Sequence, residues 1–434
     1  MKVPPYDTLW HATTAEGPRP GPPVQDLRVD AAVIGAGFAG LSAALAFAEA
    51  GVSVAVLEAG EIGAGASGRN AGFVVPHFSR ADPDTVRDRL APGHAEALLS
   101  LIESGADHVF ALAARLGLGD QAEQAGWLQP AHTAAAAAAL QARAAAWQAR
   151  GRPVRWLPAE EVAARTGMEI YHGAMADDSG GVINPLALAR GLAGLARQAG
   201  ARLHAESPVA AMRREGGTWS LRTEQGREIR ADRVLMATNA GTEGAAARLG
   251  RTVLPLQVYQ IATEPVDAAT RARIAPGRQP VSDTRTNIFT YRLDAADRLI
   301  SGGMALIPVA AEARMGRRIA ARLARELRLE AVPRVAHVWR GTAAMTRDAL
   351  PALVELGPGA WGAVGCNGRG VAFTNVFGAA LARWIAAGAD PAGAPLPVQA
   401  GHPLPMRGPG RLAPSAVLLK GMWTDRRAMR EGAR

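Results

Sequence analysis

A glycine-rich turn between an apolar run and a helical segment places the strongest constraint on how this chain folds. Residues 28–34 form a nearly continuous apolar run, which is typical of a strand buried on both faces. The residues that follow read G-x-G-x-x-G: Gly35, Ala36, Gly37, Phe38, Ala39 and Gly40. Because residues 40–50 have a helical pattern and residues 53–57 form a second apolar run, the segment predicts a strand–helix–strand unit.

The spacing of the glycines indicates what this turn binds. In such a unit Gly35 permits the tight turn, Gly37 lets a pyrophosphate approach the backbone, and Gly40 lets the helix pack against the strand. Glu58 closes the second strand, 58 − 40 = 18 residues after Gly40, close to the roughly 20 residues typical of a ribose-binding acid. We therefore predict a dinucleotide site, which the motif alone does not assign to FAD or NAD.

Length, charge and cysteine content narrow the class of protein. The 434 residues, 48% hydrophobic and 20% charged, suffice for two domains with a sizeable core. The net charge is +9, but the arginines are dispersed, which favours a genomic coding bias over a nucleic-acid surface. The single cysteine, Cys366, excludes an internal disulfide and a cysteine-rich metal site, and we expect no metal.

Segment composition suggests where the protein resides. Residues 1–30 lack the pattern of a signal peptide, and the apolar run 31–50 is interpreted as a buried strand and helix because it contains the three glycines. We therefore expect a cytoplasmic protein with no transmembrane segment.

Periodicity and breaker residues predict the remaining elements. Residues 1–28, rich in proline, are expected to form an extended arm. Helices are expected at 91–116, 133–150, 185–198, 309–327 and 371–387. Strands are expected at 202–205, 209–212, 219–223, 233–237 and 335–339, with strand-like patterns between 253 and 304.

A second small-residue stretch follows the ribose acid. Residues 63–72 read GAGASGRNAG and lead into the apolar run 73–76. Residues 63–68 also fit G-x-G-x-x-G, but they follow a turn instead of a buried strand, so we discount them as a phosphate loop. That leaves one dinucleotide site in the chain.

Together these segments resemble the glycine/D-amino-acid oxidase (DAO) family of flavoproteins, which includes sarcosine oxidase, glycine oxidase, D-amino-acid dehydrogenase and gamma-glutamylputrescine oxidoreductase. The resemblance covers nearly the whole chain, and residues 65–72 are most similar to the gamma-glutamylputrescine oxidoreductase branch. The other matching segments are 9–14, 181–185, 237–240, 263–265, 291–292, 297–303, 339–341, 346–351 and 365–371.

The resemblance implies an α/β fold, in which a Rossmann-like FAD-binding domain is interleaved with an α+β substrate domain carrying a mostly antiparallel sheet. We expect the arm at 1–28, the FAD-binding domain at 29–89, 175–248 and 335–390, the substrate domain at 90–174 and 249–334, and a tail at 391–434. If residues 1–150 folded alone as a flavin-binding unit, this interleaving would be wrong.

The resemblance also implies which residues bind FAD, with Val209 meeting adenine through its backbone and residues 365–371 lying beside the flavin ring. Besides the G-x-G-x-x-G residues and Glu58, the expected set is Ala59, Gly65, Ala66, Ser67, Arg69, Asn70, Ala71, Gly72, Val209, Thr238, Asn239, Gly365, Asn367, Gly368, Arg369, Gly370 and Val371. The cysteine and histidine that attach FAD covalently in some relatives do not occur at the matching places, so we expect non-covalent FAD.

The implied reaction is hydride transfer from the carbon beside an amine nitrogen to the flavin, with oxygen or an electron carrier as acceptor. Sarcosine-oxidase relatives often use a lysine to activate oxygen, but this chain has none between Lys2 and Lys420. Arg69, His77 or Arg340 could replace that lysine, or else oxygen is not the main acceptor.

The substrate side departs from the family as well. The carboxylate-gripping arginine of glycine oxidase is replaced by Ala343, which leaves Arg292 or Arg340 as substitutes. The candidates for the substrate pocket are His77, Tyr259, Tyr291 and Arg340. The alternatives are a D-amino-acid dehydrogenase or oxidase, a relative that modifies an aminoalkyl nucleoside of tRNA, and a flavin-loaded subunit without turnover.

Overall fold

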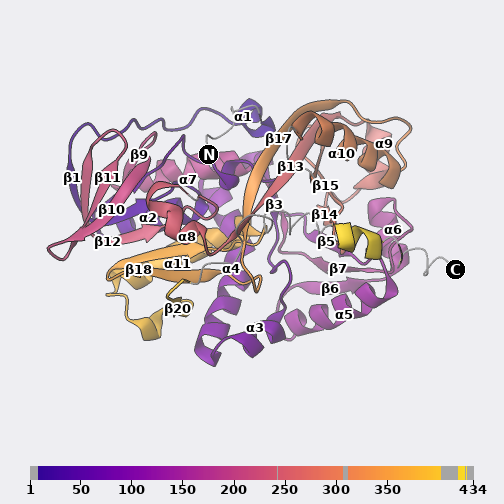
Figure 1. The fold of residues 1–434 in the computed structure, drawn as a ribbon. Coiled ribbons are helices and arrows are strands. Elements are labelled where there is room, and N and C mark those ends of the chain that lie inside the picture. The colour runs from indigo at the N-terminus through magenta and orange to yellow at the C-terminus, as the bar shows by residue number, and fades with distance from the viewer. Residues whose placement is uncertain (1–7, 242, 306–310, 402–418, 426, 428–434) are drawn as a thin grey trace.

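Two large sheets organise the chain, one in each half of the molecule (Figure 1). The computed structural model describes residues 8–241, 243–305, 311–401, 419–425 and 427. The long strands β13 (Leu254–Pro265) and β17 (Val335–Met345) run through the middle of the view, between the two halves. The mixed α/β fold predicted from the sequence is confirmed.

The first sheet has a parallel centre in the order β9-β2-β1-β12-β19. These strands are β9 (Arg202–His204), β2 (Val54–Leu57), β1 (Leu27–Ile34), β12 (Glu228–Met236) and β19 (Ala360–Val364). The strands β18 (Ala352–Gly357) and β20 (Val398–Gln399) extend one edge, and the hairpin β10 (Val209–Glu215) and β11 (Thr218–Thr223) continues from β12. Side chains on both faces of β1 are buried, as its continuous apolar run predicts.

Helices cover one face of this sheet, and the hairpin with the short turns η3 (Gly244–Ala246) and α8 (Ala247–Gly250) covers the other. The covering helices are α2 (Phe38–Glu49), α7 (Pro185–Gln198), α11 (Gly370–Ala386) and α4 (Pro92–Arg115). Asn184 starts α7 by accepting hydrogen bonds from the N–H groups of Leu186 and Ala187, with Pro185 at the first helical position.

Helix α4 is, among the described residues, the helix long and apolar enough to cross a membrane by length and composition. Of its most apolar window, 44% is buried inside the protein. Leu98, Leu99 and Ile102 pack in the same core as α2 and α11, so α4 is placed as a core helix.

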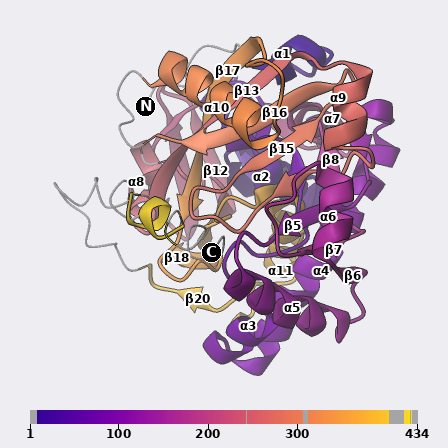
Figure 2. The ribbon, with the colours of Figure 1, turned by 90° about the vertical axis from the view of Figure 1, so that its right-hand side faces the viewer.

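The second sheet has the order β17-β13-β16-β15-β14-β5-β7-β6 and is antiparallel except between β5 and β14. Its other strands are β16 (Arg298–Met304), β15 (Thr290–Leu293), β14 (Val281–Ser282), β5 (Trp127–Pro130), β7 (Ala174–Asp177) and β6 (Val154–Leu157). Helix α10 (Glu312–Glu326) lies over β13, β16 and β17, as Figure 2 shows, while α6 (Ala159–Thr166) and α9 (Ala268–Ile274) contact each other nearby.

Smaller elements join the halves. Helix α5 (Ala134–Gln148) packs on β6 and β7, and α3 (Pro83–Arg89) packs on α4 and α5. A small sheet contains β3 (Phe73–Val74), β8 (Gly181–Ile183) and β4 (Ala122–Glu123). The remaining short elements are α1 (Leu9–Thr13), η1 (Ala66–Gly68), η2 (Gly119–Gln121) and η4 (Pro391–Gly393).

The structure differs from the sequence-based elements in several places. The arm contains α1, because Thr8 caps it and Leu9 and Trp10 are buried. Helix α9 interrupts the predicted strand region, and the start of the helix predicted at 309–327 lies partly outside the described residues.

Strand pairing also bears on the predicted domain boundaries, which remain a prediction. β17 pairs along its length with β13, so residues 335–345 lie in the second sheet, although the predicted FAD-binding segment begins at residue 335. β7 likewise belongs to the second sheet although the predicted FAD segment begins at residue 175. Conversely, α4, assigned to the substrate domain, packs on α11.

Candidate functional site

The G-x-G-x-x-G turn has the geometry that its glycines predict. Gly35 has a φ of +103°, in the range that favours glycine. A Cβ at Gly40 would lie 1.9 Å from the carbonyl oxygen of Gly35, so only glycine lets α2 approach the strand this closely. Gly37 is the N-cap of α2, and the N–H groups of the first helical turn therefore face out of the loop.

The second small-residue stretch lies against the start of α2. The hydroxyl Oγ of Ser67 accepts a hydrogen bond from Phe38 N–H at 3.0 Å, and a Cβ on Gly37 would lie 2.8 Å from it. Asn70 folds the stretch, because its amide donates to the carbonyls of Ala66 and Ser67 and its Oδ1 accepts from Gly72 N–H. Residues 65–72 and the phosphate loop thus form one surface.

Glu58, the predicted ribose-binding acid, lies beside that surface. Its Oε2 accepts from Ala36 N–H at 2.6 Å and its Oε1 accepts from Gly60 N–H at 3.0 Å. Burial raises the pKa of the Glu58 carboxyl, while these backbone hydrogen bonds lower it. Ser207 N–H donates to the Glu58 carbonyl at 2.7 Å, which brings the chain leading to Val209 beside the predicted adenine position.

A third segment, residues 365–371, meets the end of β12. Asn239 Oδ1 accepts from Gly365 N–H at 3.1 Å, and Asn239 Nδ2 lies 3.3 Å from Cys366 Sγ. Asn367 accepts from Thr346 N–H at 2.9 Å, which ties the loop to the end of β17. Gly368 has a φ of +79° with open space where a Cβ would stand, so a large ligand can lie against this backbone.

Two of the arginines considered for the substrate are engaged elsewhere. Arg292 is buried, and its Nη1 donates to the carbonyls of Gly72 at 2.9 Å and Ile183 at 3.1 Å. Its guanidinium also lies 5.4 Å from the Trp10 ring centre, and burial lowers its pKa to about 10. Arg340 points to the α10 side of the sheet, where its Nε lies 3.3 Å from Glu312 Oε1.

Tyr259 and Tyr291 share the α10 side of the sheet. Tyr259 is the cross-strand partner of Arg340, and both tyrosines pack in the core beneath α10. Tyr291 Oη donates to the Ile274 carbonyl at 2.8 Å, and burial raises the pKa of the phenol. These contacts favour packing roles, although substrate contact by these residues stays a prediction.

His77 lies apart from the other three candidates, in a buried polar cluster. Its Nε2 is 2.9 Å from Asp177 Oδ2, and both side chains are fully buried. The imidazole lies between two indoles, with ring centres 5.4 Å from Trp127 and 5.1 Å from Trp147. Burial lowers the pKa of His77 to about 4 despite the raising effect of Asp177, so the ring is neutral at neutral pH.

The sequence did not point to Trp127, which links this cluster to the third segment. The Arg369 guanidinium carbon lies 4.8 Å from the Trp127 ring centre, and Trp127 Nε1 donates to Ser282 Oγ at 2.7 Å. A lone tryptophan in a strand carries no sequence signal for such a role. Arg69, the third cation proposed in place of lysine, is buried and donates from Nε to the Ala64 carbonyl at 2.8 Å.

A comparison with protein families agrees with this geometry. The model of the DAO family, described as FAD dependent oxidoreductase, matches residues 30–384. The chain belongs to this family.

Individual DAO-family relatives cover most of the chain. Gamma-glutamylputrescine oxidoreductase of Escherichia coli (strain K12) is 28% identical over 391 residues, which are 90% of this chain and 88% of the relative. The probable oxidoreductase OrdL of Rhizobium meliloti (strain 1021) is 30% identical over 358 residues, 81% of each chain. The crystal structure of glycine oxidase from Geobacillus kaustophilus has a TM-score of 0.68 at 23% identity, covering 83% of this chain and 95% of that one.

The residues present fit the FAD of the DAO family. The start of α2 offers N–H groups, and a Cβ at Gly368 would meet nothing within 4 Å, which leaves space for a ligand at that loop. Thr238 Oγ1, beside Gly35, is buried and has no hydrogen-bond partner among the described residues, as expected of a group that a ligand satisfies. The chain is therefore an FAD-dependent oxidoreductase.

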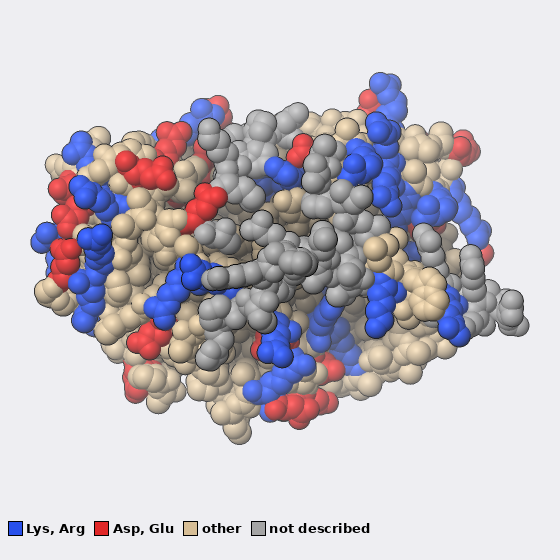
Figure 3. Space-filling model, in the orientation of Figure 1, with Lys and Arg blue, Asp and Glu red and all other residues tan. Residues whose placement is uncertain are grey.

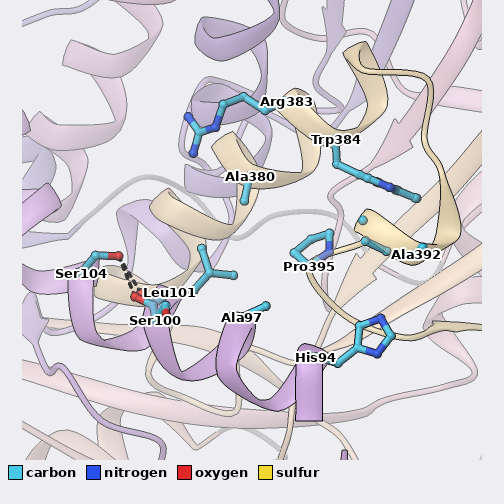
Figure 4. A pocket seen from close by; sticks show the side chains of 13 residues that line it. His94, Ala97, Ser100, Leu101, Ser104, Ala380, Arg383, Trp384, Ala392 and Pro395 are labelled. Atoms are coloured by element: carbon cyan, nitrogen blue, oxygen red, sulfur yellow. Dashed lines mark hydrogen bonds between the residues drawn. The ribbon is translucent and has the colours of Figure 1, made fainter. Parts of the chain in front are cut away.

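One described cavity lies away from this site. A groove of about 650 Å³ separates the first half of α4 from the end of α11 and the turn η4 (Figure 4). His94, Leu101, Trp384 and Pro395 line it, whereas none of the predicted FAD-binding residues does. We assign it no part in the redox site.

Proposed function

We propose that this chain oxidises the C–N bond of an amine or N-substituted amino acid to an imine, using non-covalent FAD. FAD, when bound, accepts the hydride released by the carbon beside the nitrogen. The observations that carry the proposal are that the 65–72 stretch contacts the phosphate loop and that the 365–371 loop contacts Asn239, next to Thr238 beside Gly35, all within the DAO-family match. The activities named for gamma-glutamylputrescine oxidoreductase and glycine oxidase, both acting on amino compounds, support it.

The protein's part in this reaction is to bind FAD and to bind, orient and desolvate the amine. The start of α2 and Glu58 hold the dinucleotide, and the loop 365–371 offers backbone N–H groups at the start of α11. An amine must be neutral to release a hydride, since an ammonium has no free electron pair to assist. A site that excludes water lowers the amine's pKa and supplies that form without a dedicated base.

The electron acceptor we propose is a carrier in preference to oxygen. The chain has no lysine between Lys2 and Lys420, and Arg69, Arg292 and Arg340 are each engaged in other contacts. Without a lysine, and with these three arginines engaged, negative charge developing on oxygen receives less stabilisation than in relatives that use a lysine to activate oxygen. We expect a cytoplasmic enzyme that takes a small amine and needs no nucleic acid.

A nucleic-acid substrate is the second candidate, and the surface argues against it. Figure 3 shows Lys and Arg side chains in several separate groups on the visible face, interrupted by Asp, Glu and uncharged residues. Binding of RNA by phosphate contacts favours a continuous basic patch.

Anaerobic reduction tests the proposal directly. The FAD-loaded protein is mixed with small D-amino acids, N-alkylated amino acids and polyamine-type amines, and loss of the oxidised flavin absorbance is followed by stopped flow. N-alkylated or polyamine-type donors should reduce the flavin fastest, and an artificial dye should reoxidise it faster than air does. Fastest reduction by glycine or D-alanine, or equal reoxidation by air and dye, would contradict the proposal.

A further inference from the structure

Two buried glutamines in the second sheet carry polar atoms that no described residue satisfies. Gln260 of β13 is 8% exposed and Gln129 of β5 is 5% exposed. The side-chain Oε1 of each is buried and has no hydrogen-bond partner among the described residues. Since buried polar groups in proteins are almost always hydrogen-bonded, two such acceptors point to a partner that arrives with a ligand.

Both glutamines point away from the core beneath α10. Successive side chains of a strand point to opposite faces of a sheet. Tyr259 and Ile261, on either side of Gln260, pack in the core to which α10 contributes. Leu128, which precedes Gln129, packs in the same core. Gln260 and Gln129 therefore lie on the other face of the second sheet.

This other face of the second sheet is turned toward the predicted FAD site. At one end Trp339, the cross-strand partner of Gln260, donates from Nε1 to the Arg69 carbonyl at 2.8 Å. At the other end Trp127, on the same face of β5, has its ring centre 4.8 Å from the Arg369 guanidinium carbon. The two indoles thus reach one residue in each of two predicted FAD-binding loops, and both glutamines face the same way as these indoles.

A row of uncharged polar residues joins the two glutamines across this face. Gln260 pairs with Gly302 on β16. Thr290 on β15 pairs with Ser282 on β14. The registers of β16 with β15 and of β14 with β5 complete the row, which reads Gln260, Gly302, Thr290, Ser282 and Gln129. The row offers hydroxyl and carboxamide groups but no charge, so it suits a neutral polar ligand better than a charged one.

The polar groups of this row remain available to a ligand. A Cβ at Gly302 would lie 2.6 Å from Gln260 Oε1, so only glycine lets the carboxamide lie over β16. The Ser282 hydroxyl accepts from Trp127 Nε1 at 2.7 Å and donates to no described residue. Since no hydrogen bond to a described residue holds the carboxamide of Gln260 or Gln129, each can turn about its last torsion, whose preference is broad, and present its donor or its acceptor.

We propose that this row binds the chain of the amine substrate and selects amines that carry a neutral hydrogen-bonding group, an amide above all. An amide both donates and accepts, as a glutamine carboxamide does, so the two groups can satisfy each other. An alkyl chain would leave the buried Oε1 atoms unpaired, and a carboxylate would meet no charged partner in the row. This inference rests on the proposed function and narrows it to a substrate class.

Three donors of equal shape test the selection. They are δ-aminovaleramide, the acid-bearing δ-aminovalerate and the acid-free alkylamine with an isopropyl group in place of the carboxamide. Each reduces the FAD-loaded protein anaerobically, and the apparent Kd follows from the dependence of the reduction rate on donor concentration. Wild type should bind the amide about 3- to 10-fold more tightly than either of the other two, the value of about one neutral hydrogen bond.

Matched variants locate the contact. Gln260→Leu and Gln129→Leu keep the approximate size of the side chain and remove its amide, so loss of the preference in either variant supports the row. The control Gln257→Leu removes a glutamine amide from the opposite face of β13, where Gln257 accepts from Tyr259 Oη at 3.2 Å, and should keep the preference. A wild type without the preference, a preference kept in both test variants, or an equal loss in the control would overturn the proposal.

A binding titration separates this inference from the proposed function. Valeramide has the amide but no amine to oxidise, and it is added to each protein while flavin absorbance and tryptophan fluorescence are followed. Its apparent Kd should rise about 3- to 10-fold in Gln260→Leu or Gln129→Leu and stay unchanged in Gln257→Leu. That result would support the row even if no amine reduced the wild type, which would refute only the proposed function. Valeramide binding that is equal in all four proteins, or absent from all of them, would refute the row and leave amine oxidation intact.

Discussion

The buried His77 should make the protein lose stability on mild acidification. Its pKa is lowered from 6.5 to about 4 because burial between Trp127 and Trp147 disfavours the charged ring. The unfolded chain therefore binds a proton at His77 that the folded protein does not bind, and the free energy of unfolding falls as the pH drops below 6.5. From these two pKa values the loss between about pH 7.5 and pH 5 is about 2 kcal/mol.

The assay is thermal unfolding of the FAD-loaded protein at both pH values, for wild type and His77→Gln. Glutamine keeps an amide donor toward Asp177 and cannot titrate. For a chain of 434 residues, 2 kcal/mol corresponds to a shift of about 2 °C in Tm. His77→Gln should therefore lose about 2 °C less than wild type on acidification.

Trp147→Phe serves as the control, because it loosens the same cluster but keeps the titrating histidine. Its Tm should lie below that of wild type by a similar amount at both pH values. If wild type and His77→Gln lose Tm in parallel between the two pH values, the histidine is not held neutral by burial and the reasoning fails.

Three further outcomes follow from the site. Gly37→Val should abolish FAD retention, because a Cβ there lies 2.8 Å from Ser67 Oγ and the side chain fills the space of the pyrophosphate. The control Gly194→Val, whose Cβ would stand in open space, should keep its FAD, and the flavin-to-protein absorbance ratio measures both. Acid precipitation should release free FAD into the supernatant, and yellow colour in the pellet would contradict non-covalent binding. Arg292→Met should lower the free energy of unfolding by about 2–3 kcal/mol, because the Ile183 carbonyl loses its charged donor. It should leave the preference between acid-bearing and acid-free amines unchanged, and a changed preference would show that Arg292 contacts the substrate.

The features predicted well from the sequence are those whose physics is local. Gly35 is required by a turn and Gly40 by a close approach within one strand–helix unit, so the spacing of the glycines alone predicts both features. Glu58 is similar, since the strand that ends there is a short continuous run.

The substrate side depended on information that the sequence does not hold. Side chains alternate between the two faces of the sheet along β17, so Arg340 and Ala343 lie on opposite faces. Which of the two faces α10 covers depends on how residues 312–326 pack. The contact of Arg369 with Trp127 joins two segments far apart in the chain, and no local pattern announces it. The sequence predicts Arg369 only as part of a loop beside the flavin, and it carries no signal that Nη1 is buried without a hydrogen-bond partner among the described residues.

The pairing of β1 with β12 also determines when, during synthesis, the first sheet can form. Leu27 pairs with Ile229, 229 − 27 = 202 residues later, and β19 joins β12 only at residues 360–364. At roughly 5–20 residues per second, the first strand waits roughly 10–40 s on the ribosome for its neighbour. During that interval β1 and β2 expose apolar edges, so the nascent chain needs shielding from aggregation, and a product released before α11 is made cannot assemble the FAD site.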